Sequence, residues 1–482
     1  MITEARFHDS SRLARRECSE RSNGIGEVEG TLSQSTKRAS TGRAPTRIDP
    51  IYKRLPHGPH QLARNEVIKN QRARIYGAMV EAVARSGYER TSVKQVIGLA
   101  GVSRRSFYEQ FSNKEECFLA TFDVIAGRDI SRVGKAFLSA RGGLENRLRA
   151  AFREWTESAG DSRNAAMLVL VEAQTAGSAG TLRLHRATST CEQMLARGFA
   201  ESREASALPK PIVRGITGGL HGAMSSVLRA GEATERPRLS EDMLRWTLLF
   251  QTPGAARMDE MMSARLARQM RQISLAGGRQ RSEEEPIGRD ERDRLLHNAL
   301  RLAALHDYRD LTAPQIADEA NVSVDAFLEL FATKDECFLQ ALDMIADDVL
   351  AIVADPDLVS DGWPQAVRRV LARLMGYLGE HPLYSRTIAQ EAFFAGPVAV
   401  TQNLEMANSV ATLLTEGAPS RPQSGLAVEG IAGALLHTVR CQVAGGRVQL
   451  LPALSDYLAY IVLAPYIGAE QAIAVVTDDS DA

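Results

Sequence analysis

Apolar residues recur every three to four positions along most of the chain, and segments with the strict alternation of a half-buried strand are hard to find. Val93, Val96 and Ala100, for example, fall on one face of a helix. Residues that favour helices, such as alanine, leucine, arginine and glutamate, dominate the composition. The pattern therefore predicts an all-α protein.

One block of forty residues occurs twice, 220 positions apart and without a gap. The copies are residues 87–126 and 307–346, and they agree mainly at positions that look buried. A repeat at a fixed offset indicates one folding unit that is used twice. Matches continue beyond the block, since Glu172 corresponds to Glu391 in the same sequence context. We therefore interpret the duplicated object as a whole two-domain unit.

Each copy of the block has the pattern of short helices joined by a tight turn. Gly101 stands where a left-handed residue would end the middle helix, and Asn321 can do the same in the second copy. Ser103 and Ser323 then stand where a new helix needs an N-cap. This order predicts a helix-turn-helix at about residues 94–113 and a similar one in the second copy.

The two copies differ at positions that would face a partner. The short third helix carries Arg104 and Arg105 in the first copy, and Asp325 in the second. Residues 64–114 contain ten Lys/Arg against four Asp/Glu, a net charge of +6, whereas residues 284–334 contain six against eleven, a net of −5. The formal charge of the whole chain, −1, hides this contrast. Because DNA is a dense polyanion, only the first copy has the charge that phosphate binding requires.

The first copy contains, from Thr91 onward, the string T-S-V-x-x-V-I-x-x-A-G-V-S-R-R-S-F-Y-E-Q-F-x-x-K-E-E-C-F-L. This string resembles the N-terminal DNA-binding domain of the TetR family of bacterial transcription regulators. The resemblance covers about residues 71–126 and, more weakly and without the aromatic at Tyr108, about 291–346. It implies two tandem TetR-like units, each a three-helix head followed by a helical ligand-binding and dimerisation domain, with the second head degenerate. The residues that it implies for DNA binding are Thr91, Ser92, Lys94, Ser103, Arg104, Arg105, Ser106, Tyr108 and Lys114.

The domain order follows from shifts in composition. The N-terminal segment lacks periodicity and is rich in arginine, serine, glycine and proline, so we expect disorder, as either a solvated tail or a basic arm that enters a minor groove. Glycine, proline and a charge run coincide in the central linker. The expected order is a tail at 1–63, a helix-turn-helix domain at 64–126, a regulatory domain at 127–275, the linker at 276–288, a degenerate helix-turn-helix domain at 289–346, a second regulatory domain at 347–470 and a C-terminal tail at 471–482.

A stripe of small residues between Gly215 and Gly222 indicates a close helix contact, because glycine costs about 1 kcal/mol relative to alanine inside a helix. In TetR-like proteins the last two helices of each subunit form a dimer interface. Here both partners exist in one chain, so the halves pair either as an intramolecular pseudo-dimer or with their twins in another chain. The resemblance assigns the interface to 209–230 with 239–250 (within a helix expected over 239–274) and to 425–445 with 450–466.

The resemblance also implies a small-molecule pocket in each regulatory domain, for an effector that the sequence does not identify. Such pockets are mostly apolar with few polar groups, although each candidate can equally be ordinary core. The two equivalent glutamates either cap or pair inside the bundle, or contact the ligand. The candidates are Trp155, Met167, Leu170, Glu172 and Gln174 in the first unit and Met375, Tyr377, Glu391, Phe393 and Phe394 in the second.

Other classes of function lack support in the sequence. It shows no nucleophile elbow, P-loop or dinucleotide fingerprint, so we expect neither an enzyme nor a cofactor. His221 and His437 each stand alone on a helix of small residues, so we expect no metal site. We also expect no signal peptide and no membrane helix. Five scattered cysteines without a CxxC motif fit a reducing cytoplasm.

We interpret the chain as a cytoplasmic, ligand-responsive transcription regulator, a repressor whose first head binds operator DNA. The alternative is a ligand-sensing or protein-interaction module that modulates another regulator without binding DNA itself. A pseudo-dimer would present one basic and one acidic head. Either two chains then associate on DNA, or the second head contacts a protein.

Overall fold

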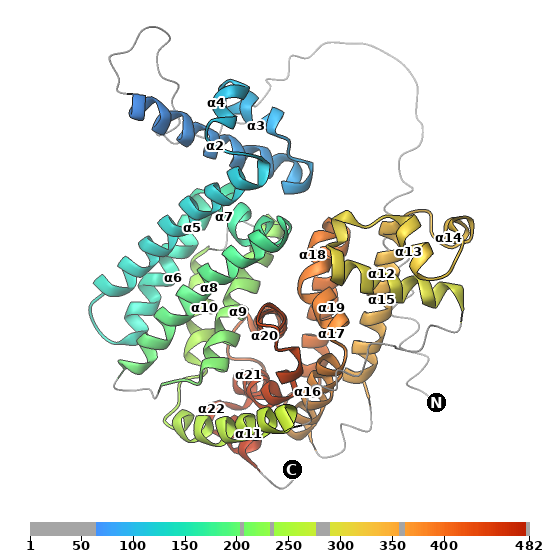
Figure 1. Cartoon of the computed structure of the whole chain (residues 1–482). Helices are drawn as coiled ribbons and strands as arrows, with labels where there is room; N and C mark the ends of the chain where they lie inside the picture. Colours follow the sequence, from blue (N-terminus) through green and yellow to red (C-terminus); the bar gives the residue numbers. More distant parts are fainter. Residues whose placement is uncertain (1–63, 203–206, 232–235, 276–289, 356–361, 479–482) are drawn as a thin grey trace, which may run out of the picture. The chain divides into compact units, whose positions relative to one another are not determined.

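The computed structural model describes residues 64–202, 207–231, 236–275, 290–355 and 362–478. Within these ranges the chain forms helices and no strand, which confirms the all-α class (Figure 1). None of the helices described here has the length and apolar character needed to span a membrane. The expected tail at 1–63 and linker at 276–288 lie outside the described residues.

The first helix-turn-helix unit has three helices, α2 (Arg64–Arg90), α3 (Val93–Ala100) and α4 (Arg104–Tyr108). Ser92 and Gln95 form a reciprocal cap at the start of α3, in which each side chain bonds the other residue's backbone N–H. Gly101 ends α3 in the left-handed conformation, with φ 58°, as the sequence predicts. The Ser103 hydroxyl then accepts a hydrogen bond from the Ser106 N–H at 3.0 Å and starts α4.

The second helix-turn-helix unit repeats this arrangement in α12 (Glu291–His306), α13 (Ala313–Glu319) and α14 (Val324–Leu330). Asn321 takes the left-handed conformation with φ 56°, and Ser323 caps α14, so both predictions for the turn are confirmed. The paired rings in the two cores also correspond, since the Phe107–Phe111 and Phe327–Phe331 centroids are both 5.6 Å apart. The acidic second unit therefore keeps the packing of the basic one.

The first regulatory domain contains α5 (Lys114–Ser139), α6 (Leu144–Asp161), α7 (Arg163–Leu170), α8 (Gly177–Ala200), α9 (Lys210–Ala230), α10 (Arg236–Leu248) and α11 (Ala255–Leu275). The single helix that the periodicity predicts over 239–274 is wrong, because the chain leaves the helix between α10 and α11. Pro253 lies in this break, where its ring and missing N–H prevent a continuous helix.

The second regulatory domain contains α15 (Lys334–Val353), α16 (Trp363–Glu380), α17 (Pro382–Arg386), α18 (Ala392–Phe394), α19 (Pro397–Thr415), α20 (Ala427–Ala444), α21 (Ser455–Ile467) and α22 (Ala469–Thr477). A π-helical turn, Thr387–Glu391, joins α17 to α18. The expected C-terminal tail at 471–482 is wrong for its first part. Ala472, Ile473 and Val476 are buried on one face of α22, which packs against α21.

The two halves of the chain meet through α9 and α20, which lie side by side in Figure 1. A Cβ atom on Gly433 would lie only 2.6 Å from the carbonyl oxygen of Gly218, and one on Gly219 would lie 2.8 Å from that of Gly430. Trp246 of α10 fills the adjoining space and donates its indole N–H to a carbonyl of α9 at 3.4 Å. The stripe of small residues therefore allows two helix backbones to approach each other within one chain.

Candidate nucleic-acid interface and ligand pocket

The basic surface of the first unit lies on α4. The side chain of Arg105 is 89% exposed and pairs with Glu109 one turn later, at 2.9 Å. The Arg104 guanidinium lies 5.6 Å from the centre of the exposed Tyr108 ring. Lys94 on α3 is also exposed. Surface ion pairs contribute little, about 0–1 kcal/mol, so Arg105 can exchange Glu109 for a phosphate or a base edge at low cost.

The hydroxyl groups among the predicted DNA-binding residues make contacts within the protein. Thr91 is buried, and its hydroxyl donates to the Gly87 carbonyl at 2.7 Å. The Ser103 and Ser106 hydroxyls are hydrogen-bonded to each other at 2.9 Å. Ser92 is exposed but committed to the cap of α3. These residues shape the surface of the helix-turn-helix unit, whereas the long cationic side chains of α3 and α4 extend from it.

Lys114 connects the head to the long helix α5. Its ammonium group donates to the carbonyls of Tyr88 and Glu89 at 3.0 and 3.1 Å and lies 4.2 Å from the centre of the Tyr88 ring. Burial lowers the pKa of Lys114 from its ordinary value. Lys334 makes the equivalent contacts in the second unit. Because both copies keep this lysine, it stabilises the head whether or not the head binds DNA.

The equivalent surface of the second unit is apolar and acidic. Val324 and Leu328 of α14 are 41% and 54% exposed, and Asp325 between them is also exposed. An aspartate and two aliphatic side chains offer no donor to a phosphate. The chemical difference predicted from the sequence is therefore displayed on the surface of the fold.

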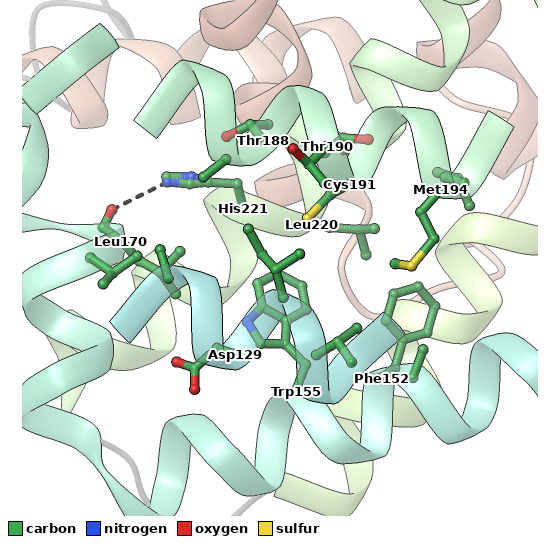
Figure 2. Close-up of a pocket in the computed structure, with 18 of the residues that line it drawn as sticks. Asp129, Phe152, Trp155, Leu170, Thr188, Thr190, Cys191, Met194, Leu220 and His221 are labelled. Carbon is green, nitrogen blue, oxygen red and sulfur yellow. Dashed lines mark hydrogen bonds between the residues drawn. The ribbon is translucent and has the colours of Figure 1, made fainter. Parts of the chain in front are cut away.

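A cavity of about 150 Å³ lies inside the first regulatory domain, lined by residues of α5, α6, α7, α8 and α9 (Figure 2). Two of the predicted pocket residues, Trp155 and Leu170, line it. Most of its wall is apolar, and the exceptions include Asp129, Thr188 and His221. A mostly apolar cavity with a few polar groups is the usual form of a small-molecule site.

His221 is the pocket residue whose chemistry the sequence did not reveal. Its Nε2 lies 3.2 Å from the Leu170 carbonyl oxygen, the contact drawn as a dashed line in Figure 2. Burial, with the nearby Arg440, lowers the pKa of His221 to about 3, so the ring is neutral near pH 7. A neutral imidazole both donates and accepts, so this contact with Leu170 orients it beside the cavity. The only signal in the sequence was a histidine among small residues.

Three other predicted pocket residues of the first unit do not line this cavity. Glu172 is turned toward the head, where its carboxylate accepts a hydrogen bond from the Tyr88 N–H at 2.9 Å. Gln174 lines a different cavity, between α9 and α20. Met167 is partly buried against the hydrophobic core. Glu172 and Gln174 lie in the turn after α7, which directs their side chains away from this cavity, whereas Met167 lies on α7 itself.

Of the predicted pocket residues of the second unit, Phe393 lines the cavity beside α9 and α20, and the other four line none of the cavities described here. Met375 and Phe394 are buried in the core. Tyr377 donates its hydroxyl to Asp348 at 2.7 Å. The remaining two make contacts with arginines: Glu391 with Arg386 at 3.1 Å, and Phe393 with Arg440, whose guanidinium lies 4.8 Å from the ring centre.

Glu391 also completes a correspondence between the two units. Burial raises its pKa, and both Arg386 and the backbone N–H of Tyr308 oppose that shift by favouring the charged form. Tyr308 is the counterpart of Tyr88, to which Glu172 bonds. The equivalent glutamates therefore both face the end of the first head helix, which agrees with a capping role and not with a ligand contact.

A known family matches the chain at both helix-turn-helix units. Residues 75–121 and 295–341 each match the family described as bacterial regulatory proteins, tetR family. Among solved structures, the fatty acid degradation regulator FadR from Bacillus halodurans is 18% identical, with 36% of this chain and 96% of that chain covered and a TM-score of 0.33. The regulator FadR from Bacillus subtilis in complex with stearoyl-CoA is also 18% identical, with the same coverage and a TM-score of 0.34. No curated protein matches the chain.

Proposed function

We propose that this chain is a DNA-binding transcriptional regulator of the TetR family, and that it represses transcription by binding operator DNA through its first helix-turn-helix unit. In this proposal a small apolar ligand in the first regulatory domain releases the DNA. The second unit completes the fold but does not read the operator.

The contrast between α4 and α14 is the main support for assigning DNA binding to the first unit. Arg104 and Arg105 extend from α4 into solvent, whereas α14 presents Asp325 between exposed aliphatic side chains. Arginine reaches both phosphates and guanine edges in a major groove. Aspartate in the same position would be repelled by the DNA backbone.

The path from ligand to DNA in this proposal is the helix α5. Its first turns are packed in the core of the head, where Phe118 and Phe122 are buried. Farther along, Asp129 and Val133 of the same helix line the cavity. A ligand that fits only one position of α5 would favour the corresponding position of the head, and so would change its affinity for DNA.

The chemistry of the cavity indicates the class of ligand. Its wall consists largely of aliphatic and aromatic side chains, and its polar groups are few. We therefore expect an uncharged or amphipathic molecule with a substantial apolar part. A series of fatty acids of increasing chain length is a suitable probe, with Trp155 fluorescence as the signal. A selected ligand that left operator affinity unchanged would contradict the proposed response.

The contact between α9 and α20 supports a monomer that contains its own dimer-like interface. The surfaces that would pair with a twin subunit are covered within the chain. We therefore expect light scattering to give the mass of one chain in the absence of DNA. A mass of two chains would favour pairing with a second copy.

The test of the DNA-binding unit compares two variants of the full-length chain. DNA selected from a random pool by the wild-type protein provides the operator, and its half-sites show how many heads are engaged. Replacing both Arg104 and Arg105 with alanine should weaken DNA binding at least roughly 30-fold, since each base contact contributes about 1–3 kcal/mol. Asp325→Ala, the matched change in the second unit, should leave binding nearly unchanged.

The salt dependence provides an independent readout. Wild-type affinity should fall steeply as salt rises, and the arginine variant should have a shallower slope because fewer phosphates are neutralised. If Asp325→Ala abolished binding while the arginine variant retained it, the assignment of the heads would be wrong. A wild-type chain that ignored duplex DNA at low salt would instead favour a module that acts on another regulator.

A further inference from the structure

Helices from opposite halves of the chain bring together four side chains that commonly bind metals. His437 and Cys441 lie on α20, and Glu192 and His185 lie on α8. The His437 Nε2 is 3.1 Å from a Glu192 carboxylate oxygen and 3.5 Å from the Cys441 sulfur. The His185 Nδ1 is 4.0 Å from the same sulfur. The first three side chains are buried, and His185 is half-buried.

These separations resemble those between the ligands of a tetrahedral zinc ion. With Zn–S at about 2.3 Å and Zn–N or Zn–O at about 2.0–2.1 Å, neighbouring ligand atoms lie roughly 3.3–3.6 Å apart. The contacts of 3.1 and 3.5 Å are within a few tenths of an ångström of this range. The 4.0 Å contact is longer than this range, so the His185 ring would move toward the other three donors to complete the set. We infer that Glu192, His437, Cys441 and His185 form a binding site for one zinc ion.

The helix geometry explains why the donors converge. His437 and Cys441 are four residues apart, so they lie one above the other on the same face of α20. His185 and Glu192 are seven residues apart, which is close to two helical turns and also places them on one face. Two helices that face each other therefore supply two ligands each, a set that no single segment of the sequence contains.

The carboxylate of the cluster also has a partner outside the proposed ligand set. Arg214 lies 3.8 Å from the other oxygen of Glu192 and holds this carboxylate in place. Such outer partners orient the ligands of metal sites.

The first half of the chain has a related pair that lacks the thiol. His221 and Ser225 have the same four-residue spacing on α9, but both side chains contact the Leu170 carbonyl oxygen. Of the two related helices, only α20 therefore carries the histidine–cysteine pair. The proposed ligand set joins α20 of the second half to α8 of the first half. A bound ion would fasten α8, which also lines the ligand cavity through Cys191, to the opposite half.

The test uses the purified full-length chain, stripped of metal and then titrated with cobalt(II) and zinc(II). We expect about one equivalent of metal per chain, the strong visible absorption of four-coordinate cobalt and a thiolate-to-cobalt charge-transfer band. Cys441→Ser should remove the charge-transfer band and weaken zinc binding at least about tenfold. His437→Gln should weaken zinc binding similarly, and circular dichroism should show that both variants remain folded.

Cys191→Ser is the matched control, because this thiol lies next to Glu192 in the sequence but lines the ligand cavity. It should bind cobalt with the wild-type spectrum. The inference is overturned if wild type takes up no more metal than Cys441→Ser, or if Cys191→Ser loses the charge-transfer band as well. Metal uptake and the cobalt spectrum do not depend on DNA binding. A failure of the zinc-site inference can therefore be told apart from a failure of the proposed DNA-binding function.

Discussion

Replacing Gly433 with alanine tests the junction between the two halves with the smallest possible change. The added Cβ would lie 2.6 Å from the carbonyl oxygen of Gly218 and 3.1 Å from the Cα of Gly219. Both neighbours are backbone atoms of α9, so no flexible side chain can move aside. One methyl group would therefore push two long helices apart.

The magnitude follows from two opposing effects. Alanine gains about 1 kcal/mol over glycine inside a helix, through its higher helix propensity. Overpacking a tightly packed contact costs typically about 1–3 kcal/mol, and a rigid contact this short belongs at the upper end. Gly433→Ala should therefore destabilise the chain by up to about 2 kcal/mol. Gly127 in α5 has no atom within 4 Å of its added Cβ, so Gly127→Ala should instead stabilise by up to about 1 kcal/mol.

Thermal unfolding followed by circular dichroism compares the two variants with wild type. The expected order of midpoints is Gly127→Ala above wild type and Gly433→Ala below it. Because the contact lies within one chain, the midpoints should not change with protein concentration. A Gly433→Ala variant as stable as Gly127→Ala would refute the close contact, and midpoints that rise with concentration would show that it forms between chains.

Three further variants test the site and its connections. Glu172→Ala removes the acceptor that ties the first head to its regulatory domain, so it should cost about 1–3 kcal/mol and reduce the effect of ligand on DNA affinity, measured by fluorescence anisotropy. Lys114→Met should lower the stability of the first head by about 1–3 kcal/mol, measured by amide hydrogen exchange, because two carbonyls lose a charged donor. The pKa of His221 falls from 6.5 to about 3 on folding, so its neutral form contributes stability above pH 6.5 that is lost as the pH falls. Between pH 7 and 5 the wild-type chain should lose roughly 2 kcal/mol of unfolding free energy through His221. His221→Gln should lose that much less over the same pH range, measured by urea titration. An equal loss in both proteins would contradict the assignment.

Features that depend on neighbouring residues could be predicted from the sequence. Ser92, Gly101 and Ser103 act within a few residues of themselves, and the structure has the caps and the left-handed turn that they predict. The tandem arrangement was visible because a repeat needs only comparison of the chain with itself. The single helix predicted over 239–274 shows the limit, since periodicity continued across a proline that breaks the helix.

Features that depend on distant residues required the tertiary structure. The turn after α7 directs Glu172 to the backbone of Tyr88, 84 residues earlier. Nothing in the sequence around these two residues indicates that they are in contact. Likewise, His437 and Cys441 share one face of α20, but Glu192, 245 residues from His437 in the sequence, comes within 3.1 Å of His437 only through the packing of α8 and α20.

The sequence by itself therefore determined the helices, the repeat and the charge that separates the two heads. Only the tertiary structure decided which side chains share a cavity or a cluster of ligands. The physical reason is range: caps and periodicity act over one or two turns of helix, whereas the distance between two helices depends on every side chain packed between them.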